Sequence, residues 1–349
     1  MSGASSAATL STAVLIRLGE LTNHTFVLPY LIFYPTSRCN SRCVSCDWWK
    51  CSGADDLTLD EIDSVARALP ALGTKVVEFS GGEPLLRPEV FEAAQSFRAQ
   101  GVELHLVTSG VLLERRAVAV AREFSRVVVS LDATTEELYH AIRGVSALSL
   151  VERGVACLRR MAPEVPVTAR ATLHRLNFRE LPRLIDHAKT MAFDGISFLP
   201  ADVSSPAFGR ERVSQTGTLA LDAREIAELG AIVERTIQDH CDDIESGFVT
   251  ESADKLRWLG RYYSALSNGG HFPTVSCNAP YTSVVVEADG IVRPCYFHEP
   301  IGNIRQMSLG SIVSRNLPAF RRTLDVETNP VCRRCACSVR SRWGSAPWQ

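Results

Sequence analysis

Three closely spaced cysteines constrain this chain more than any other feature. Cys39, Cys43 and Cys46 follow the pattern Cys-x3-Cys-x2-Cys, directly after an apolar run at residues 30–34 that predicts a buried strand. Thiolates are the ligands of iron–sulfur clusters, which normally take four of them. Three thiolates on a cubane cluster leave one iron open to a small-molecule ligand. Half of a zinc site is the alternative, because Cys-x2-Cys pairs also bind zinc.

A second motif follows one strand and one helix later. Residues 75–80 predict a strand that leads into Gly81-Gly82-Glu83-Pro84. Two glycines at a strand end let a ligand approach the backbone, and a carboxylate can meet a cation. Such a segment alone most often marks a turn, so its position one βα unit after the cysteine loop is the informative part.

The order of predicted elements indicates an α/β fold. Apolar strand patterns alternate with helical patterns, which favours a parallel sheet with right-handed crossovers that curls into a partial (β/α)6 TIM-like barrel. Ligands of such barrels bind at the carboxyl ends of the strands, where both motifs fall. The predicted strands are residues 30–34, 75–80, 102–108, 126–132, 165–173 and 195–199.

The two motifs together resemble the signature of the radical S-adenosylmethionine (radical SAM) superfamily, whose fold is such a barrel. The resemblance implies a 4Fe–4S cluster on Cys39, Cys43 and Cys46 that binds SAM. One electron then cleaves SAM to methionine and a 5′-deoxyadenosyl radical, which takes a hydrogen atom from the substrate. In one departure from the family pattern, Ser45 precedes the third cysteine where an aromatic residue is frequent.

The resemblance also implies which side chains contact SAM. Gly81, Gly82 and Glu83 would hold the methionine ammonium, while Ser109 and Ser130 follow the third and fourth strands and would contact the ribose and carboxylate. Asp132 and Arg143 either join this site or are a turn residue and a surface charge. Trp48 and Trp49 could wall the adenine side of the pocket.

A second group of cysteines lies near the end of the sequence. Cys277 and Cys295 flank a predicted hairpin with an Asp-Gly turn, which brings them to one end. Cys332 and Cys335 form a Cys-x2-Cys pair, so four thiolates are available for zinc or for a cluster. With the N-terminal motifs, this pattern resembles the SPASM and twitch extensions of radical SAM enzymes and implies a second, auxiliary 4Fe–4S cluster.

The remaining cysteines have weaker signals. Cys337 is either a spare or a replacement ligand, and its position shortly before the end of the sequence favours the twitch arrangement with one auxiliary cluster. Cys51 and Cys157 fit neither spacing and are not expected to be ligands. Cys157 and Cys241 lie in helical patterns and are expected to be ordinary buried thiols.

Four regions follow from these assignments, with a boundary where Ser, Gly, Pro and Arg dominate after residue 200. The connector carries no chemical motif, and its aromatic residues are expected in the core. The regions are an N-terminal extension (1–28), the radical SAM partial barrel (29–215), a helical connector (216–272) and a twitch/SPASM auxiliary-cluster domain with a β-hairpin and helices (273–349).

The charge balance and the cysteine content indicate which kinds of molecule this protein binds. Lys plus Arg number 37 and Asp plus Glu 39, for a net charge of -2, which provides no electrostatic footprint for nucleic acid. Eleven cysteines that cluster in two places fit metal ligation better than disulfides. We expect a cytoplasmic protein, because the sequence shows neither a membrane span nor a convincing signal peptide.

Three functions fit the sequence. The first is oxidation of a small biosynthetic metabolite such as an aminocyclitol or sugar, by analogy with the twitch dehydrogenase of butirosin biosynthesis, with a flavodoxin or ferredoxin as electron donor. The second is a maturase of a ribosomally made peptide or protein, although few residues precede the first strand for a peptide-recognition domain. The third is a non-catalytic iron–sulfur or zinc protein, which the intact Gly81-Gly82-Glu83 disfavours.

Overall fold

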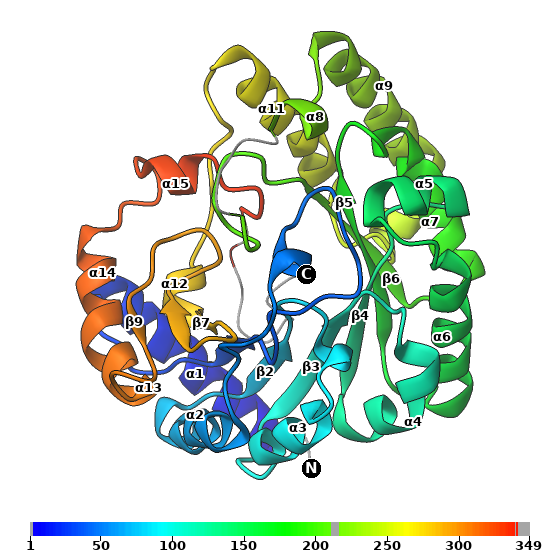
Figure 1. The fold of residues 1–349 in the computed structure, drawn as a ribbon. Helices are drawn as coiled ribbons and strands as arrows, with labels where there is room; N and C mark the ends of the chain where they lie inside the picture. Colours follow the sequence, from blue (N-terminus) through cyan, green and yellow to red (C-terminus); the bar gives the residue numbers. More distant parts are fainter. Residues whose placement is uncertain (1–2, 211–215, 339, 341–349) are drawn as a thin grey trace.

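The computed structural model describes residues 3–210, 216–338 and 340 of the 349-residue chain. Within these residues one nine-stranded sheet runs in the order β6-β5-β4-β3-β2-β1-β7-β8-β9. Strands β1 to β6 pair in parallel and curve into an open barrel, with the helices around its outside (Figure 1). The predicted partial barrel is confirmed. Its strands are β1 (Tyr30–Phe33), β2 (Val76–Phe79), β3 (Glu103–Thr108), β4 (Arg126–Ser130), β5 (Val167–Leu173) and β6 (Gly195–Pro200).

Helices connect these strands and cover their outer face. The sequence Thr58-x-x-Glu61 predicts a capping box, and Pro70 predicts the end of the helix that follows. The capping box is confirmed, but the helix continues past Pro70. Proline has a helical φ and removes only one backbone hydrogen bond, so the last turn is completed and ends at Gly73, whose φ is 68°. The helices are α2 (Leu59–Leu72), α3 (Val90–Arg98), α4 (Leu113–Glu123), α5 (Glu136–Arg143), α6 (Leu148–Met161) and α7 (Leu181–Thr190).

The two faces of the barrel sheet differ in chemistry. In β5, residues Val167, Ala169, Ala171 and Leu173 belong to the hydrophobic core, whereas the alternating positions are partly exposed. Because successive side chains of a strand point to opposite faces, Arg170 lies on the face opposite the core, toward the barrel interior. The sheet is thus apolar under its helices and carries polar side chains inside.

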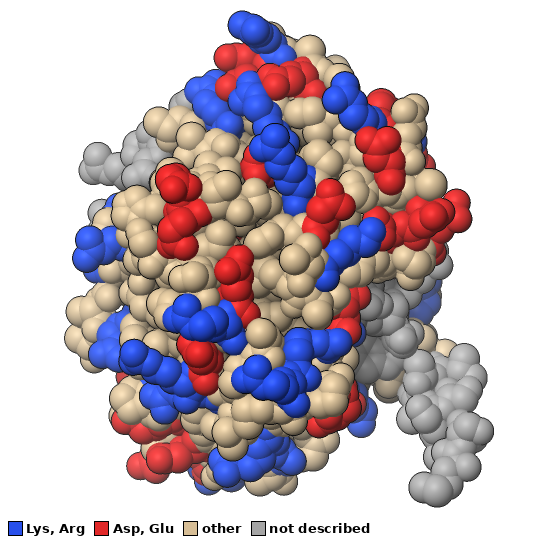
Figure 2. All heavy atoms as spheres, turned by 90° about the vertical axis from the view of Figure 1, so that its right-hand side faces the viewer, with Lys and Arg blue, Asp and Glu red and all other residues tan. Residues whose placement is uncertain are grey.

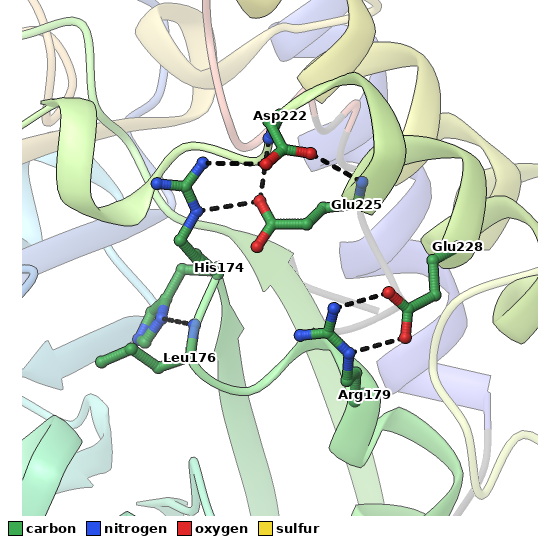
Figure 3. A network of polar contacts seen from close by, with 7 residues as sticks. His174, Leu176, Arg179, Asp222, Glu225 and Glu228 are labelled. Atoms are coloured by element: carbon green, nitrogen blue, oxygen red, sulfur yellow. Dashed lines mark hydrogen bonds and ion pairs between the residues drawn. The ribbon is translucent and has the colours of Figure 1, made fainter.

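The connector packs against the end of β5 and the edge of β6. Figure 3 shows Arg179 paired with Glu228 and the carboxylate of Glu225 close to the Asp222 cap of α9. Tyr263 is buried and donates to the carbonyl oxygen of Leu173 at 2.5 Å, so the expectation of core aromatics is confirmed. The connector helices are α8 (Thr216–Leu219), α9 (Ala223–Asp239), α10 (Cys241–Glu245) and α11 (Ala253–Asn268).

The C-terminal hairpin continues the barrel sheet. Strand β7 pairs in parallel with β1, β8 pairs antiparallel with β7, and β9 pairs antiparallel with β8. The apolar pattern of residues 281–287 predicts a strand, but β7 starts only at Ser283, because Tyr281 belongs to a short helix. These elements are β7 (Ser283–Val286), β8 (Ile291–Arg293), β9 (Gly302–Asn303), α12 (Ala279–Thr282), α13 (Leu309–Ser311), η4 (Ile312–Asn316), α14 (Leu317–Thr323) and α15 (Pro330–Arg333).

The N-terminal region forms helix α1 (Gly3–Thr22), which contacts α12. Among the described residues, no helix is both long and apolar enough to cross a bilayer. Basic and acidic side chains are interspersed over the helical face in Figure 2.

Candidate active site and auxiliary cluster site

A cavity of about 210 Å³ opens at the carboxyl ends of the barrel strands. Its wall combines the cysteine loop with the loops that follow β2, β3 and β4. The structure thereby brings together every residue predicted for the N-terminal site. They are Cys39, Cys43, Cys46, Gly81, Gly82, Glu83, Ser109 and Ser130, together with Asp132 and Arg143.

The Gly-Gly-Glu segment is bonded directly to the cysteine loop. The N–H of Gly82 donates to the carbonyl oxygen of Thr36 at 3.1 Å, and that of Glu83 donates to Arg38 at 2.8 Å. Gly81 has a φ of 98°, and a β-carbon there would meet the Tyr34 ring at 2.6 Å. The glycines therefore allow two loops to touch, a role that the sequence interpretation, which considered only a ligand, did not include.

Both carboxylate oxygens of Glu83 accept hydrogen bonds from the protein itself. Its buried carboxylate accepts hydrogen bonds from the Thr108 hydroxyl at 2.8 Å, the Ser109 N–H at 2.7 Å and the Leu85 N–H at 3.1 Å. Burial raises its pKa despite these donors. The side chain thus ties the end of β2 to the end of β3, and through Ser109 it also reaches Asn40 in the cysteine loop.

The far side of the cysteine loop rests on α5 and on the segment after β6. The N–H groups of Arg42 and Val44 donate to the carbonyl oxygens of Arg143 and Ile142 at 2.7 and 2.9 Å. The N–H of Asp47 donates to the carbonyl oxygen of Phe208 at 2.9 Å. The loop is therefore held from three sides, by elements distant in sequence.

Asp132 and Arg143 form a buried ion pair of 2.5 Å beside the cysteines, with side chains 5% and 11% exposed. Asp132 also accepts from the N–H of Thr172 at 2.7 Å, and Arg143 donates to the sulfur of Cys43 at 3.6 Å. The interpretation of these residues as a turn residue and a surface charge is wrong, because both are buried against the cavity.

The chemistry of this pocket fits an iron–sulfur cluster with an anionic ligand. Within the described residues, buried polar atoms without a partner include Asn40 Nδ2, Ser41 Oγ and Arg143 Nε, all on or beside the cysteine loop. Such atoms are rare in native proteins, and a bound ligand is one way in which their missing hydrogen bonds are supplied. Burial raises the pKa of Cys39 to about 12 and also raises those of Cys43 and Cys46. Bound metal would stabilise the thiolates against this effect.

The C-terminal cysteines line a second, smaller pocket. Cys277, Cys295, Cys332 and Cys335 come together there with His298, as the hairpin predicts. The Asn329 side chain caps α15 by accepting from the N–H of Cys332, and His298 Nε2 lies 3.2 Å from the sulfur of that cysteine. Among the described residues, no group of three or more His, Cys, Asp or Glu side chains converges closely enough for a single metal ion.

The other cysteines are placed as follows. Cys337 hydrogen-bonds to Cys335 and thereby lowers the pKa of Cys335, and it also lines the larger cavity. Cys51 and Cys157 line neither cysteine pocket. Cys241 is exposed, so its expected burial is wrong, because it starts α10 at the surface.

The sequence pattern did not predict several residues of the pocket. Asp202 and Phe208 line the cavity from the segment after β6, which had been predicted only as a boundary loop. Asp202 is buried and pairs with Arg210 at 2.5 Å, which shapes this segment against the cysteines. Neither Trp48 nor Trp49 is among the described residues that line the cavity, since Trp48 packs on Tyr34 and Trp49 turns back onto the cysteine loop.

Comparisons with known proteins agree with this geometry. The family model of the radical SAM superfamily matches residues 33–188, and that of the SPASM iron–sulfur cluster-binding domain matches residues 277–336. A GTP 3′,8-cyclase of Bradyrhizobium diazoefficiens is 28% identical over 325 residues, covering 87% of this chain and 85% of that protein. An AdoMet-dependent heme synthase of Methanosarcina barkeri is 31% identical over 161 residues, 45% of this chain and 46% of that protein.

Solved structures share the fold at low sequence identity. Native anSMEcpe with bound AdoMet has a TM-score of 0.63 at 18% identity and covers 92% of this chain and 93% of its own. SuiB of Streptococcus suis bound to its precursor peptide SuiA also scores 0.63, at 15% identity, over 92% of this chain and 74% of its own. Because both family models match and the cysteines of each motif line a common pocket, this chain belongs to the radical SAM superfamily, whose members use SAM and a 4Fe–4S cluster, and it carries a C-terminal SPASM-type iron–sulfur domain.

Proposed function

We propose that this radical SAM enzyme dehydrogenates a small biosynthetic metabolite such as an aminocyclitol or sugar. When bound, the cluster and SAM supply a 5′-deoxyadenosyl radical, which takes the hydrogen atom from a carbinol carbon. The remaining substrate radical then loses one proton and one electron and becomes a ketone. The auxiliary cluster, which Cys277, Cys295, Cys332 and Cys335 would hold, would accept that electron, and 5′-deoxyadenosine, methionine and the ketone would be the products.

The contact between the two cysteine pockets supports this proposal. Phe297 lines both pockets, and residues 335–337 pass from the auxiliary pocket into the wall of the SAM-side cavity. A substrate in that cavity would therefore lie one side chain from the auxiliary cluster. This arrangement suits a reaction in which the substrate radical must be oxidised, because the acceptor lies beside it.

Different residues of the barrel would bind the cluster, orient SAM and hold the cysteine loop in place. Cys39, Cys43 and Cys46 would hold the cluster, while Ser109 and Ser130 would orient SAM from the ends of β3 and β4. The ion pair of Asp132 and Arg143 would keep the cysteine loop fixed on α5. We further propose that a cytoplasmic flavodoxin or ferredoxin supplies the first electron.

Deuterium transfer tests the proposal. The anaerobically reconstituted enzyme, with SAM and reduced flavodoxin, is incubated with sugars and aminocyclitols that carry deuterium on their carbinol carbons. The expected result is deuterium in 5′-deoxyadenosine and a product that lacks two hydrogen atoms. If these substrates give no transfer while a ribosomal precursor peptide is modified, the protein is a maturase and the dehydrogenase proposal fails.

A further inference from the structure

A second cavity lies in the barrel interior beside the SAM-side cavity. Its volume is about 320 Å³, and the two cavities share Leu199 and Cys337 in their walls. Arg170 from β5 contributes to it, together with Glu251 and Lys255 from the connector. The described part of the connector thus closes the open edge of the barrel with charged side chains.

Arg170 has no ion-pair partner among the described residues, although the buried carboxyl group of Glu78 interacts with it electrostatically. Its Nε donates to the hydroxyl of Ser197 at 3.2 Å, which fixes the plane of the guanidinium group. Among the described residues, its two terminal nitrogens make neither a hydrogen bond nor an ion pair. A guanidinium group presents a planar fork of donors that matches carboxylate and phosphate oxygens. The free part of this fork therefore faces the cavity ready for an anion.

Lys255 places a second cation at the same cavity. Its Nζ donates to the carbonyl oxygens of Cys337 at 2.9 Å and Ser338 at 3.3 Å, and lies 3.7 Å from the centre of the Trp258 ring. These contacts are all uncharged and hold the ammonium group in place, while burial lowers its pKa.

Glu251 is the acidic residue of the cavity wall, and the backbone already uses one of its oxygens. Its Oε2 accepts from the N–H of Phe198 at 2.9 Å. Burial raises its pKa to about 7, so the carboxyl group is partly protonated at neutral pH. It therefore offsets only part of the charge of Arg170 and Lys255.

We propose that this cavity binds an anionic group of the substrate, a carboxylate or a phosphate, on the guanidinium fork of Arg170 with Lys255 beside it. The rest of the substrate would extend past Leu199 and Cys337 into the SAM-side cavity. This inference rests on the proposed function and narrows its substrate class. It favours an acidic or phosphorylated sugar over a free aminocyclitol, whose positive charge would be repelled.

Thermal stabilisation by simple anions tests the subsite without turnover. The reconstituted holoenzyme is heated with inorganic phosphate or with acetate, each against chloride at matched ionic strength. A bound anion raises the apparent Tm because it binds only the folded protein. We expect a saturable rise for the wild type, and the larger of the phosphate and acetate responses indicates a phosphorylated or an acidic substrate.

Variants then assign the response to Arg170. Arg170→Gln should abolish the rise in Tm, Arg170→Lys should keep part of it because the charge remains without the fork, and Ser197→Ala should weaken it. Arg179→Gln is the matched control, since Arg179 pairs with Glu228 on the surface and should leave the response unchanged. If Arg170→Gln does not fold, the lysine and Ser197 variants decide.

The subsite is refuted if the wild type shows no anion-dependent rise or if the Arg170 and Ser197 variants respond like the wild type. The result is separate from the proposed function, because no reductant is present. A phosphate response that depends on Arg170 supports the subsite even if no sugar is dehydrogenated. Deuterium transfer in a protein without that response supports the dehydrogenase alone.

Discussion

Gly82 lies against the carbonyl oxygen of Arg38, so closely that a β-carbon on Gly82 would come within 2.1 Å of it. No relaxed contact between carbon and oxygen is this short, and the obstacle is backbone rather than a flexible side chain. Arg38 immediately precedes the first cysteine of the motif. The end of β2 and the cysteine loop can therefore pack this closely only because Gly82 has no side chain.

Replacement of this glycine should disrupt the SAM site. Gly82→Ala must push the cysteine loop away, which breaks the hydrogen bond from Glu83 to Arg38 and displaces Cys39. We expect iron content to fall by about four atoms per chain and SAM cleavage to be lost. Iron analysis and 5′-deoxyadenosine release measure both effects. Gly230→Ala in α9 is the control, because its β-carbon would meet no atom within 4 Å; equal iron in both variants would contradict the prediction.

The three N-terminal cysteines should be indispensable for SAM cleavage. The triple alanine variant of Cys39, Cys43 and Cys46, reconstituted anaerobically and reduced with dithionite, should release no 5′-deoxyadenosine. Cys51→Ala and Cys157→Ala are matched controls that should retain their iron, because neither thiol lines either cysteine pocket. Undiminished release from the triple variant would remove the assignment, and loss of a cluster from either control would add a ligand.

The four C-terminal cysteines should hold a second 4Fe–4S cluster, for about eight irons in all. In the triple variant of the first motif, Mössbauer spectra and iron analysis should still find about four irons, because the pocket of Cys277, Cys295, Cys332 and Cys335 is separate. Variants of these four should cleave SAM when reduced but fail to complete the substrate reaction. Stoichiometric zinc without iron would instead make the site structural and remove the main support for a dehydrogenase.

Glu251 should make stability depend on pH near neutrality. Folding raises its pKa from the ordinary value of 4.5 to about 7, through burial that outweighs the attraction of Arg170 and Lys255. The folded state thus binds the proton more tightly, so the stabilising contribution is complete below 4.5 and is lost as pH rises through about 7. Glu251→Gln stays neutral and keeps an acceptor for Phe198.

The measurement compares the apparent Tm of Glu251→Gln and of the wild type from about pH 6 to about pH 8. The variant should gain on the wild type as pH rises, by roughly 1 kcal/mol over this range. The exposed Glu114, paired with Arg153 on the surface, provides the control variant Glu114→Gln, which should show no such gain. A difference in Tm that is constant with pH would show that Glu251 titrates normally.

Much of the fold could be predicted because its determinants are local. Each barrel strand is a short apolar run followed by a helical pattern, and this alternation alone implies parallel pairing. The cysteine spacing likewise places three sulfur atoms on one short loop. The boundaries that were wrong, at Pro70 and at Tyr281, depend on how a turn is completed, which is decided by backbone hydrogen bonds rather than by composition.

The sequence by itself therefore determined the cluster ligands as candidates, the barrel and the order of its parts. Tertiary structure decided the rest, because it depends on contacts between residues far apart in the chain. β7 joins β1, so the auxiliary pocket lies beside the SAM-side cavity. In the sequence, Arg170 is a single charged residue in a strand whose polar and apolar residues alternate. It lines a charged cavity because the connector brings Glu251 and Lys255 to the open edge of the barrel. Such a cavity has no sequence pattern, since its walls come from segments that meet only in the folded chain.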